Sequence, residues 1–98
     1  RVISSMAYRW ASEAKSANFN VSTTPTVGDI MVCEGTIVWD NGLICDAGQF
    51  GDGHVAYVTA VNGDKVSVTE MNWCTTCNQT NTYRIAGMQF IHGKKEVV

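Results

Sequence analysis

The sequence has few charged side chains, a single proline and no long apolar run. Charged residues make up 16 % of the 98 residues and the formal net charge is −2, so there is no basic surface for nucleic acid or for an anionic membrane. No apolar stretch approaches the ~20 residues that a transmembrane helix requires, and the first residues lack the apolar segment of a signal peptide. The low charge argues against nucleic-acid binding, and the lack of a long apolar run argues against membrane insertion. Any export signal would have to lie outside this chain.

The length predicts one small domain. A chain of 98 residues can bury one modest core and leaves no room for a second domain. The single proline, Pro25, lies within residues 22–28, which are predicted to be a connection. No internal repeat or low-complexity segment interrupts this domain.

A hairpin is the clearest local feature. Residues 54–61 are predicted to form a strand, because they are rich in valine and follow chain-breaking glycines. Residues 62–64 (NGD) then form a turn, since Asn-Gly tolerates the positive φ of tight turns. Residues 65–71 should therefore return antiparallel beside the first strand.

This hairpin is expected to bring three polar side chains together at one end. The start of one strand lies near the end of its antiparallel partner, so His54 is predicted beside Glu70 or Asn72. Glu70 and Asn72 point to the same side because side chains alternate along a strand. A histidine held by a carboxylate or an amide is the base and orienting partner of a nucleophilic site. Glu70 is the preferred partner and Asn72 its competitor, and both can contribute.

A helix and further strands are predicted around the hairpin. The helix is capped by Ser4 or Ser5 and runs to about Asn18, with Trp10 supplying most of its apolar surface. Residues 43–53 are predicted to be a glycine-rich loop beside the histidine and a wall of a substrate groove. The further strands are Ile30–Cys33 and Thr36–Trp39, which form a second hairpin, Thr82–Ile85 and Gln89–His92. A helix with antiparallel strands predicts an α+β fold with the helix on one side of the sheet.

The four cysteines leave several hypotheses open. Cys74 and Cys77 have the spacing of a zinc knuckle or redox pair, and Cys33 and Cys45 could supply two more thiolates for zinc. Eleven residues separate Cys33 from Cys45, which does not match a second zinc pair, and no helix follows Cys77 to lower a thiol pKa. Free or locally bridged cysteines in loops are favoured over zinc and over disulfides. None is predicted to be a nucleophile, and no cofactor is expected.

Three blocks in order give the chain a resemblance to a known family. Residues 53–58 (GHVAYV), 68–73 (VTEMNW) and 87–92 (GMQFIH) resemble the CHAP family, the cysteine, histidine-dependent amidohydrolases/peptidases of phage lysins and bacterial wall-remodelling enzymes. Residues 24–30 (TPTVGDI) are similar to the family's segment before its first core strand. The resemblance covers nearly the whole chain. It implies a papain-like fold, with His54 as the catalytic histidine.

The family's nucleophile has no counterpart in this sequence. In CHAP proteins the cysteine opens a helix ahead of the Pro-x-x-Gly-Asp block, in a Cys-Thr-Trp-Tyr type motif, and nothing here matches it. Residues 8–15 (YRWASEAK) resemble the helix that follows. Residues 1–98 are therefore expected to be the C-terminal portion of a single CHAP domain with an incomplete helical lobe. The nucleophile would come from an upstream part of the same polypeptide, and the chain alone is expected to be inactive.

The resemblance implies hydrolysis of bacterial peptidoglycan, by an N-acetylmuramoyl-L-alanine amidase or an endopeptidase of the phage endolysin type. The expected place of action is the bacterial cell wall, reached by secretion or by release of a phage-encoded protein from the host cytoplasm. Wall-binding domains or subunits are expected partners. His92 is interpreted as a structural or solvated histidine. The alternative function is a non-catalytic wall-binding module or a small interaction domain stabilised by zinc.

Overall fold

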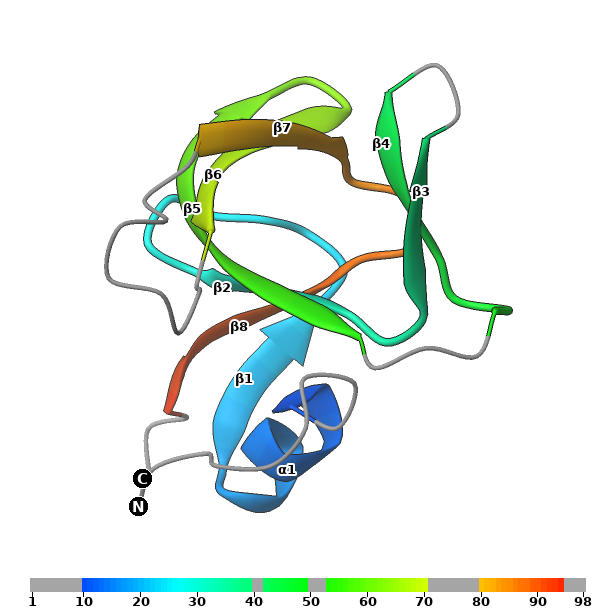
Figure 1. Cartoon of the computed structure of the whole chain (residues 1–98). Helices are drawn as coiled ribbons and strands as arrows, with labels where there is room; N and C mark the ends of the chain where they lie inside the picture. Colours follow the sequence, from blue (N-terminus) through cyan, green and yellow to red (C-terminus); the bar gives the residue numbers. More distant parts are fainter. Residues whose placement is uncertain (1–9, 40–41, 50–52, 71–79, 95–98) are drawn as a thin grey trace.

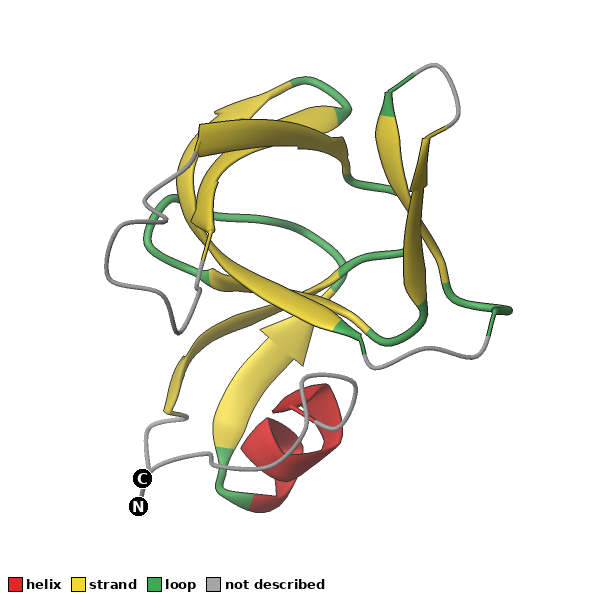
Figure 2. Ribbon diagram, viewed as in Figure 1, coloured by secondary structure: helices red, strands yellow, loops and turns green. Residues whose placement is uncertain are grey.

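The computed structural model describes residues 10–39, 42–49, 53–70 and 80–94, which form one curled sheet with a helix beside it (Figure 1, Figure 2). The strand order in the sheet is β1-β8-β2-β5-β6-β7-β4-β3. Neighbouring strands are antiparallel except β4 and β7, which run parallel. The elements are α1 (Trp10–Ser16), β1 (Phe19–Ser22), β2 (Ile30–Cys33), β3 (Thr36–Trp39), β4 (Leu43–Asp46), β5 (His54–Asn62), β6 (Lys65–Glu70), β7 (Thr80–Arg84) and β8 (Gln89–Lys94).

Helix α1 packs beside β1 through small residues (Figure 1). Ala11 and Ala14 are buried, and their short side chains let the helix approach the sheet closely. Asn18 has a φ of 70°, a left-handed conformation that commonly follows the end of a helix. The predicted part of the helix before Trp10 lies outside the described residues. Over the described part of the chain, no helix is long and apolar enough to cross a membrane.

The main core lies inside the curl of the sheet. Val66 and Val68 on β6 and Phe90 on β8 are fully buried there, and a buried side chain of this kind stabilises the fold by about 1.5–3 kcal/mol. The inner cluster contains Met31, Cys33, Cys45, Ala56, Val58, Val66, Val68, Tyr83, Met88 and Phe90. A smaller cluster under α1 contains Ala11, Ala14, Val32, Val55 and Ile91. Strands β2, β5 and β8 contribute to both clusters, so they are apolar on both faces.

The predicted α+β, papain-like fold is wrong for the residues that the structure describes. Their one helix has 7 residues, and the rest of the regular structure is an 8-stranded sheet. The sheet covers its own inner face by curling, where the prediction required a helical lobe (Figure 2). The pairing of β4 with β7 is parallel, so the sheet is not purely antiparallel as predicted. Two further strands extend the sheet: β1, for which no strand was predicted, and β4, which falls in the segment predicted as a loop.

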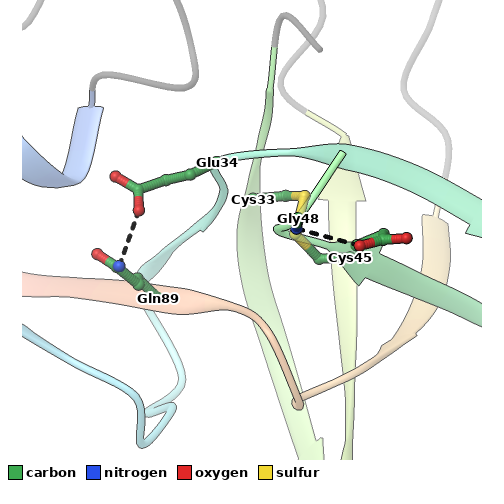
Figure 3. Close-up of a disulfide and its surroundings, with 6 residues drawn as sticks. Cys33, Glu34, Cys45, Gly48 and Gln89 are labelled. Carbon is green, nitrogen blue, oxygen red and sulfur yellow. Dashed lines mark hydrogen bonds between the residues drawn. A yellow bond between two sulfur atoms is a disulfide. The ribbon is translucent and has the colours of Figure 1, made fainter. Parts of the chain in front are cut away.

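The region predicted as a loop from residue 43 begins with a strand. Strand β4 pairs with β3, so the predicted hairpin of β2 with β3 is also wrong. The apolar triplet Leu43, Ile44 and Cys45 after a turn was the signal for this strand. A disulfide joins Cys45 to Cys33, with Cα atoms 5.6 Å apart, and ties the β3–β4 hairpin to β2 (Figure 3).

Candidate active site

Strands β5 and β6 form the predicted hairpin. Asn62 pairs with Lys65 across a turn in which Gly63 has a φ of 63°, and glycine adopts this left-handed conformation without steric cost. Strand β5 begins at His54 and β6 ends at Glu70, so the predicted strand, turn and return strand are confirmed. The end of β6 therefore comes back along the start of β5.

A β-bulge in β5 decides which side chains share a face. The register of the hairpin shifts by one residue at Thr59, and Ala56 consequently pairs with Glu70. Without the bulge, Tyr57 would pair with Glu70, and His54 would point to the opposite face from that carboxylate. The extra residue places His54, Ala56 and Glu70 together on the inner face of the curl.

The side chains of His54 and Glu70 are in direct contact. Nε2 of His54 lies 2.5 Å from Oε1 of Glu70, and the two side chains are 32 % and 10 % exposed. Because a carboxylate only accepts hydrogen bonds, the ring donates from Nε2, and Nδ1 of the neutral imidazole keeps a free lone pair. The predicted approach of His54 to Glu70 is thus present. Asn72, the competing partner, lies outside the described residues.

Strand β7 holds the second oxygen of this carboxylate. Oε2 of Glu70 accepts hydrogen bonds from Asn81 Nδ2 at 2.6 Å and from the Tyr83 hydroxyl at 2.5 Å. Three donors around one carboxylate fix its orientation and, through it, the orientation of the His54 ring. Asn81 and Tyr83 are not among the residues predicted for the site. Their alternate spacing on a strand was visible in the sequence, but the pairing of β7 with β6 was not.

Tyr83 is a buried phenol in contact with a carboxylate. Its burial raises the pKa of the phenol above the usual value, and the hydrogen bond to Glu70 and the charge of Glu70 raise that pKa further. The hydroxyl therefore stays protonated and remains a donor to Glu70. The ring centroids of Tyr83 and His54 are 6.0 Å apart, so the imidazole has an aromatic neighbour as well as a carboxylate.

Cys33 pairs with His54 across β2 and β5, but its thiol is not free. Its sulfur is bonded to Cys45, so neither of these two cysteines can act as a nucleophile or as a thiolate ligand of zinc. The favoured hypothesis of free or locally bridged cysteines in loops allowed such a bridge, but these two cysteines lie in strands and not in loops. Cys74 and Cys77 lie outside the described residues. Within the described ranges, no group of three or more His, Cys, Asp or Glu side chains could hold a metal ion.

His92 lies on β8, away from the β5–β6 hairpin. Its Nδ1 is 2.8 Å from Oδ2 of Asp29 and its Nε2 is 2.6 Å from Oγ of Ser22. Strand β2 separates β8 from β5 in the sheet, so these three residues form a group distinct from His54 and Glu70. A purely structural role for His92 stays a prediction.

One family model and several known proteins match this chain. A family model described as CHAP domain matches residues 2–72. Over 92 aligned residues the chain is 34 % identical to Staphylococcal secretory antigen ssaA2 of Staphylococcus aureus. This alignment covers 88 % of this chain and 29 % of that protein. Over 65 aligned residues it is 45 % identical to a Streptococcus mutans protein with the word hydrolase in its name, covering 65 % of this chain and 24 % of that protein.

A solved structure has a similar fold. An N-acetylmuramoyl-L-alanine amidase from Staphylococcus aureus superposes with a TM-score of 0.67 at 25 % sequence identity, covering 94 % of this chain and 26 % of that chain. The chain therefore spans about a quarter of the length of the proteins that it matches.

Proposed function

Because this chain belongs to the CHAP family, as its match over residues 2–72 shows, we propose that it forms part of a peptidoglycan hydrolase. The proposed reaction is hydrolysis of an amide bond by cysteine–histidine catalysis. The similar amidase supports the amide between the glycan's lactyl group and the stem peptide as the target. A bond within the stem peptide is the second choice.

The proposed mechanism begins with a cysteine thiol supplied from outside these 98 residues. Nδ1 of His54, the ring nitrogen not engaged by Glu70, takes the proton of this thiol, and the thiolate attacks the amide carbonyl. The imidazolium then gives its proton to the leaving amine as the C–N bond breaks. Water hydrolyses the resulting thioester with His54 as the base, which regenerates the thiol.

One observation carries the proposal: a carboxylate held by two other donors keeps one oxygen for the histidine. Glu70 turns Oε1 to His54 while Asn81 and Tyr83 occupy Oε2. The negative charge of Glu70 stabilises the imidazolium that forms when the thiol ionises, and the contact through Nε2 leaves Nδ1 available to the thiol. Asn72 is proposed as a further contributor to ring orientation, on the family resemblance alone.

The test is the change His54→Ala in the complete polypeptide that carries these residues. Removing a general base costs about 10²–10⁴-fold in rate, so clearing of a Gram-positive cell-wall suspension should fall at least a hundredfold. Tyr57→Phe is the matched control, because Tyr57 lies on the same strand, is exposed and points to the other face. Equal clearing by the His54→Ala and wild-type proteins would contradict the proposal.

The proposed partner and place of action follow from the substrate. The partner is bacterial peptidoglycan, met at the cell wall after secretion or, for a phage-encoded protein, after release from the host cytoplasm. Residues 1–98 are proposed to be the C-terminal portion of one CHAP domain and inactive alone, with wall-binding domains or subunits as further partners. A zinc-stabilised module built on four thiolates has less support, because Cys33 and Cys45 are bonded to each other.

A further inference from the structure

A second group of chemically coupled side chains lies where β1, β8 and the start of β2 meet. Ser22 ends β1, His92 lies on β8 and Asp29 immediately precedes β2. The Ser22 hydroxyl oxygen is 2.6 Å from Nε2 of His92, and Nδ1 of the same ring is 2.8 Å from a carboxylate oxygen of Asp29. Hydroxyl, imidazole and carboxylate thus stand in line through opposite nitrogens of one ring.

The direction of the hydrogen bonds follows from the carboxylate. Asp29 can only accept, so His92 donates from Nδ1, and Nε2 of the neutral ring accepts the hydroxyl proton of Ser22. Oγ of Ser22 also lies 3.2 Å from both the amide nitrogen and the carbonyl oxygen of Thr24. The carbonyl is a weaker competitor for the hydroxyl proton than the imidazole, because its contact with Oγ is 3.2 Å long and that of Nε2 is 2.6 Å long. This polarity is the one that a serine nucleophile and its base require.

Burial increases from the hydroxyl to the carboxylate. Ser22 is exposed, the His92 side chain is 26 % exposed and the Asp29 side chain is 5 % exposed. Oδ2 of Asp29 also accepts a hydrogen bond from the amide of Thr26 at 2.6 Å, so the buried charge is stabilised and its position is fixed. A reagent can reach the hydroxyl, whereas the carboxylate is protected from water.

We propose that Ser22 is a second nucleophile that accepts acyl groups from small carboxylic esters. His92 activates Ser22, and Asp29 orients the ring of His92. Ser22 Oγ attacks the ester carbonyl and forms a new C–O bond while its proton passes to Nε2 of His92. The proton then leaves with the alcohol as the original ester C–O bond breaks. Water, deprotonated by His92, hydrolyses the acyl-serine and restores the hydroxyl.

Two local features support ester chemistry at this position. The amide of Thr24, directed at Oγ of Ser22, stabilises negative charge on that oxygen as its proton leaves. A surface hollow of about 430 Å³ is lined by Thr23, the residue that follows Ser22 in the chain, and by residues 85–89. A hollow of this size can receive a small acyl or alcohol group.

The experiment treats the complete polypeptide with p-nitrophenyl acetate and maps acetylated serines by peptide mass spectrometry over time. Ser22 should be acetylated about a hundredfold faster than the exposed Ser12 of α1, because only Ser22 has a general base. Both rates come from the same folded wild-type protein, so no variant has to fold for this comparison. Equal rates at the two serines would overturn the proposal, as would the absence of acetylated Ser22 together with p-nitrophenol release no faster than that of the His92→Gln protein.

Variants then identify the base and separate this site from the first. His92→Gln should lower the rate at Ser22 about a hundredfold and leave the rate at Ser12 unchanged. An unchanged rate at Ser22 would overturn the role of His92. His54→Ala should leave acetylation of Ser22 unchanged while wall clearing is lost, so failure of either proposal can be recognised independently of the other.

Discussion

Glu70 must accept three hydrogen bonds, and only a carboxylate can do so in this position. The donors are the ring of His54, the amide of Asn81 and the hydroxyl of Tyr83. A glutamine at this position would present an NH₂ group to at least one of these donors. The Glu70 carboxylate is therefore expected to stabilise both the sheet and the positive charge that the His54 ring acquires during the reaction.

Glu70→Gln should lower both stability and activity. Leaving a buried donor unpaired costs about 1–3 kcal/mol, which should appear as a lower free energy of unfolding in urea. Wall clearing should also show a narrower active pH range, because an amide stabilises the imidazolium less than a carboxylate does. Glu34→Gln is the matched control, since its oxygen can still accept the hydrogen bond from Gln89. Unchanged stability and pH profile in Glu70→Gln would remove Glu70 from the site.

Tyr83 should make the fold sensitive to alkali. The phenol ionises near pH 10 in the unfolded chain, whereas burial and Glu70 raise its pKa in the folded chain. Above this pH the folded state binds the extra proton, so stability is fully present below about pH 10 and falls as the pH rises, by up to about 1.4 kcal/mol per pH unit. Tyr83→Phe should be less stable near neutrality but lose less between about pH 9 and pH 11. Parallel pH curves of unfolding free energy for the two proteins would contradict this.

Among the strands, the β5–β6 hairpin was predictable from its sequence and its bulge was not. The valine pattern and Asn62-Gly63 define the two strands and the turn. The shift at Thr59 depends on which residues the rest of the sheet buries, because both faces of β5 carry apolar residues. Because the bulge is not visible in the sequence, the sequence predicts the approach of His54 to Glu70 only from the meeting of two strand ends. The residue-by-residue pairing of the two strands cannot be derived from it.

The disulfide acts at the level of the β3–β4 hairpin. It closes a loop between residues 12 apart in sequence, and a loop of this size contributes about 3 kcal/mol by limiting the unfolded chain. The double change Cys33→Ala with Cys45→Ala should therefore lower the melting temperature by roughly 10 °C or more. A reducing agent should destabilise the wild-type chain much more than the double variant. Equal melting of wild type and double variant would show that the bridge does not hold this hairpin.

For the whole molecule, the sequence indicates most strands but not how the sheet closes. Local patterns locate β2, β3, β5, β6, β7 and β8, because each is an apolar or alternating run near a turn signal. The strand order depends on contacts between segments far apart in sequence, which local patterns do not encode. The expectation of a papain-like fold came from the family resemblance, and it required a layer of helices over the sheet. In the described residues the sheet instead curls over its own inner face.

Closure of the curl depends on a glycine at the corner between β7 and β8. A Cβ atom on Gly87 would lie 2.5 Å from the carbonyl oxygen of Cys45, and its φ is 83°. Gly87→Ala should therefore cost about 2 kcal/mol or more, from the left-handed conformation and the clash together. Gly93→Ala is the matched control, because its Cβ would meet nothing within 4 Å. Thermal melting should separate the two variants by roughly 8 °C or more, and similar melting would contradict this account of the corner.

The disulfide also changes what a single cut in the backbone would do. Strand β2 and strand β4 are joined through Cys33 and Cys45, and the chain between them carries the β3–β4 hairpin with its exposed Trp39. A protease that cleaves between these cysteines produces two fragments that remain covalently linked. On the two sides of the cut, β2 stays hydrogen-bonded to β5 and β4 stays hydrogen-bonded to β7. Release of the fragments then requires reduction as well as proteolysis, so the nicked protein stays one molecule in an oxidising environment.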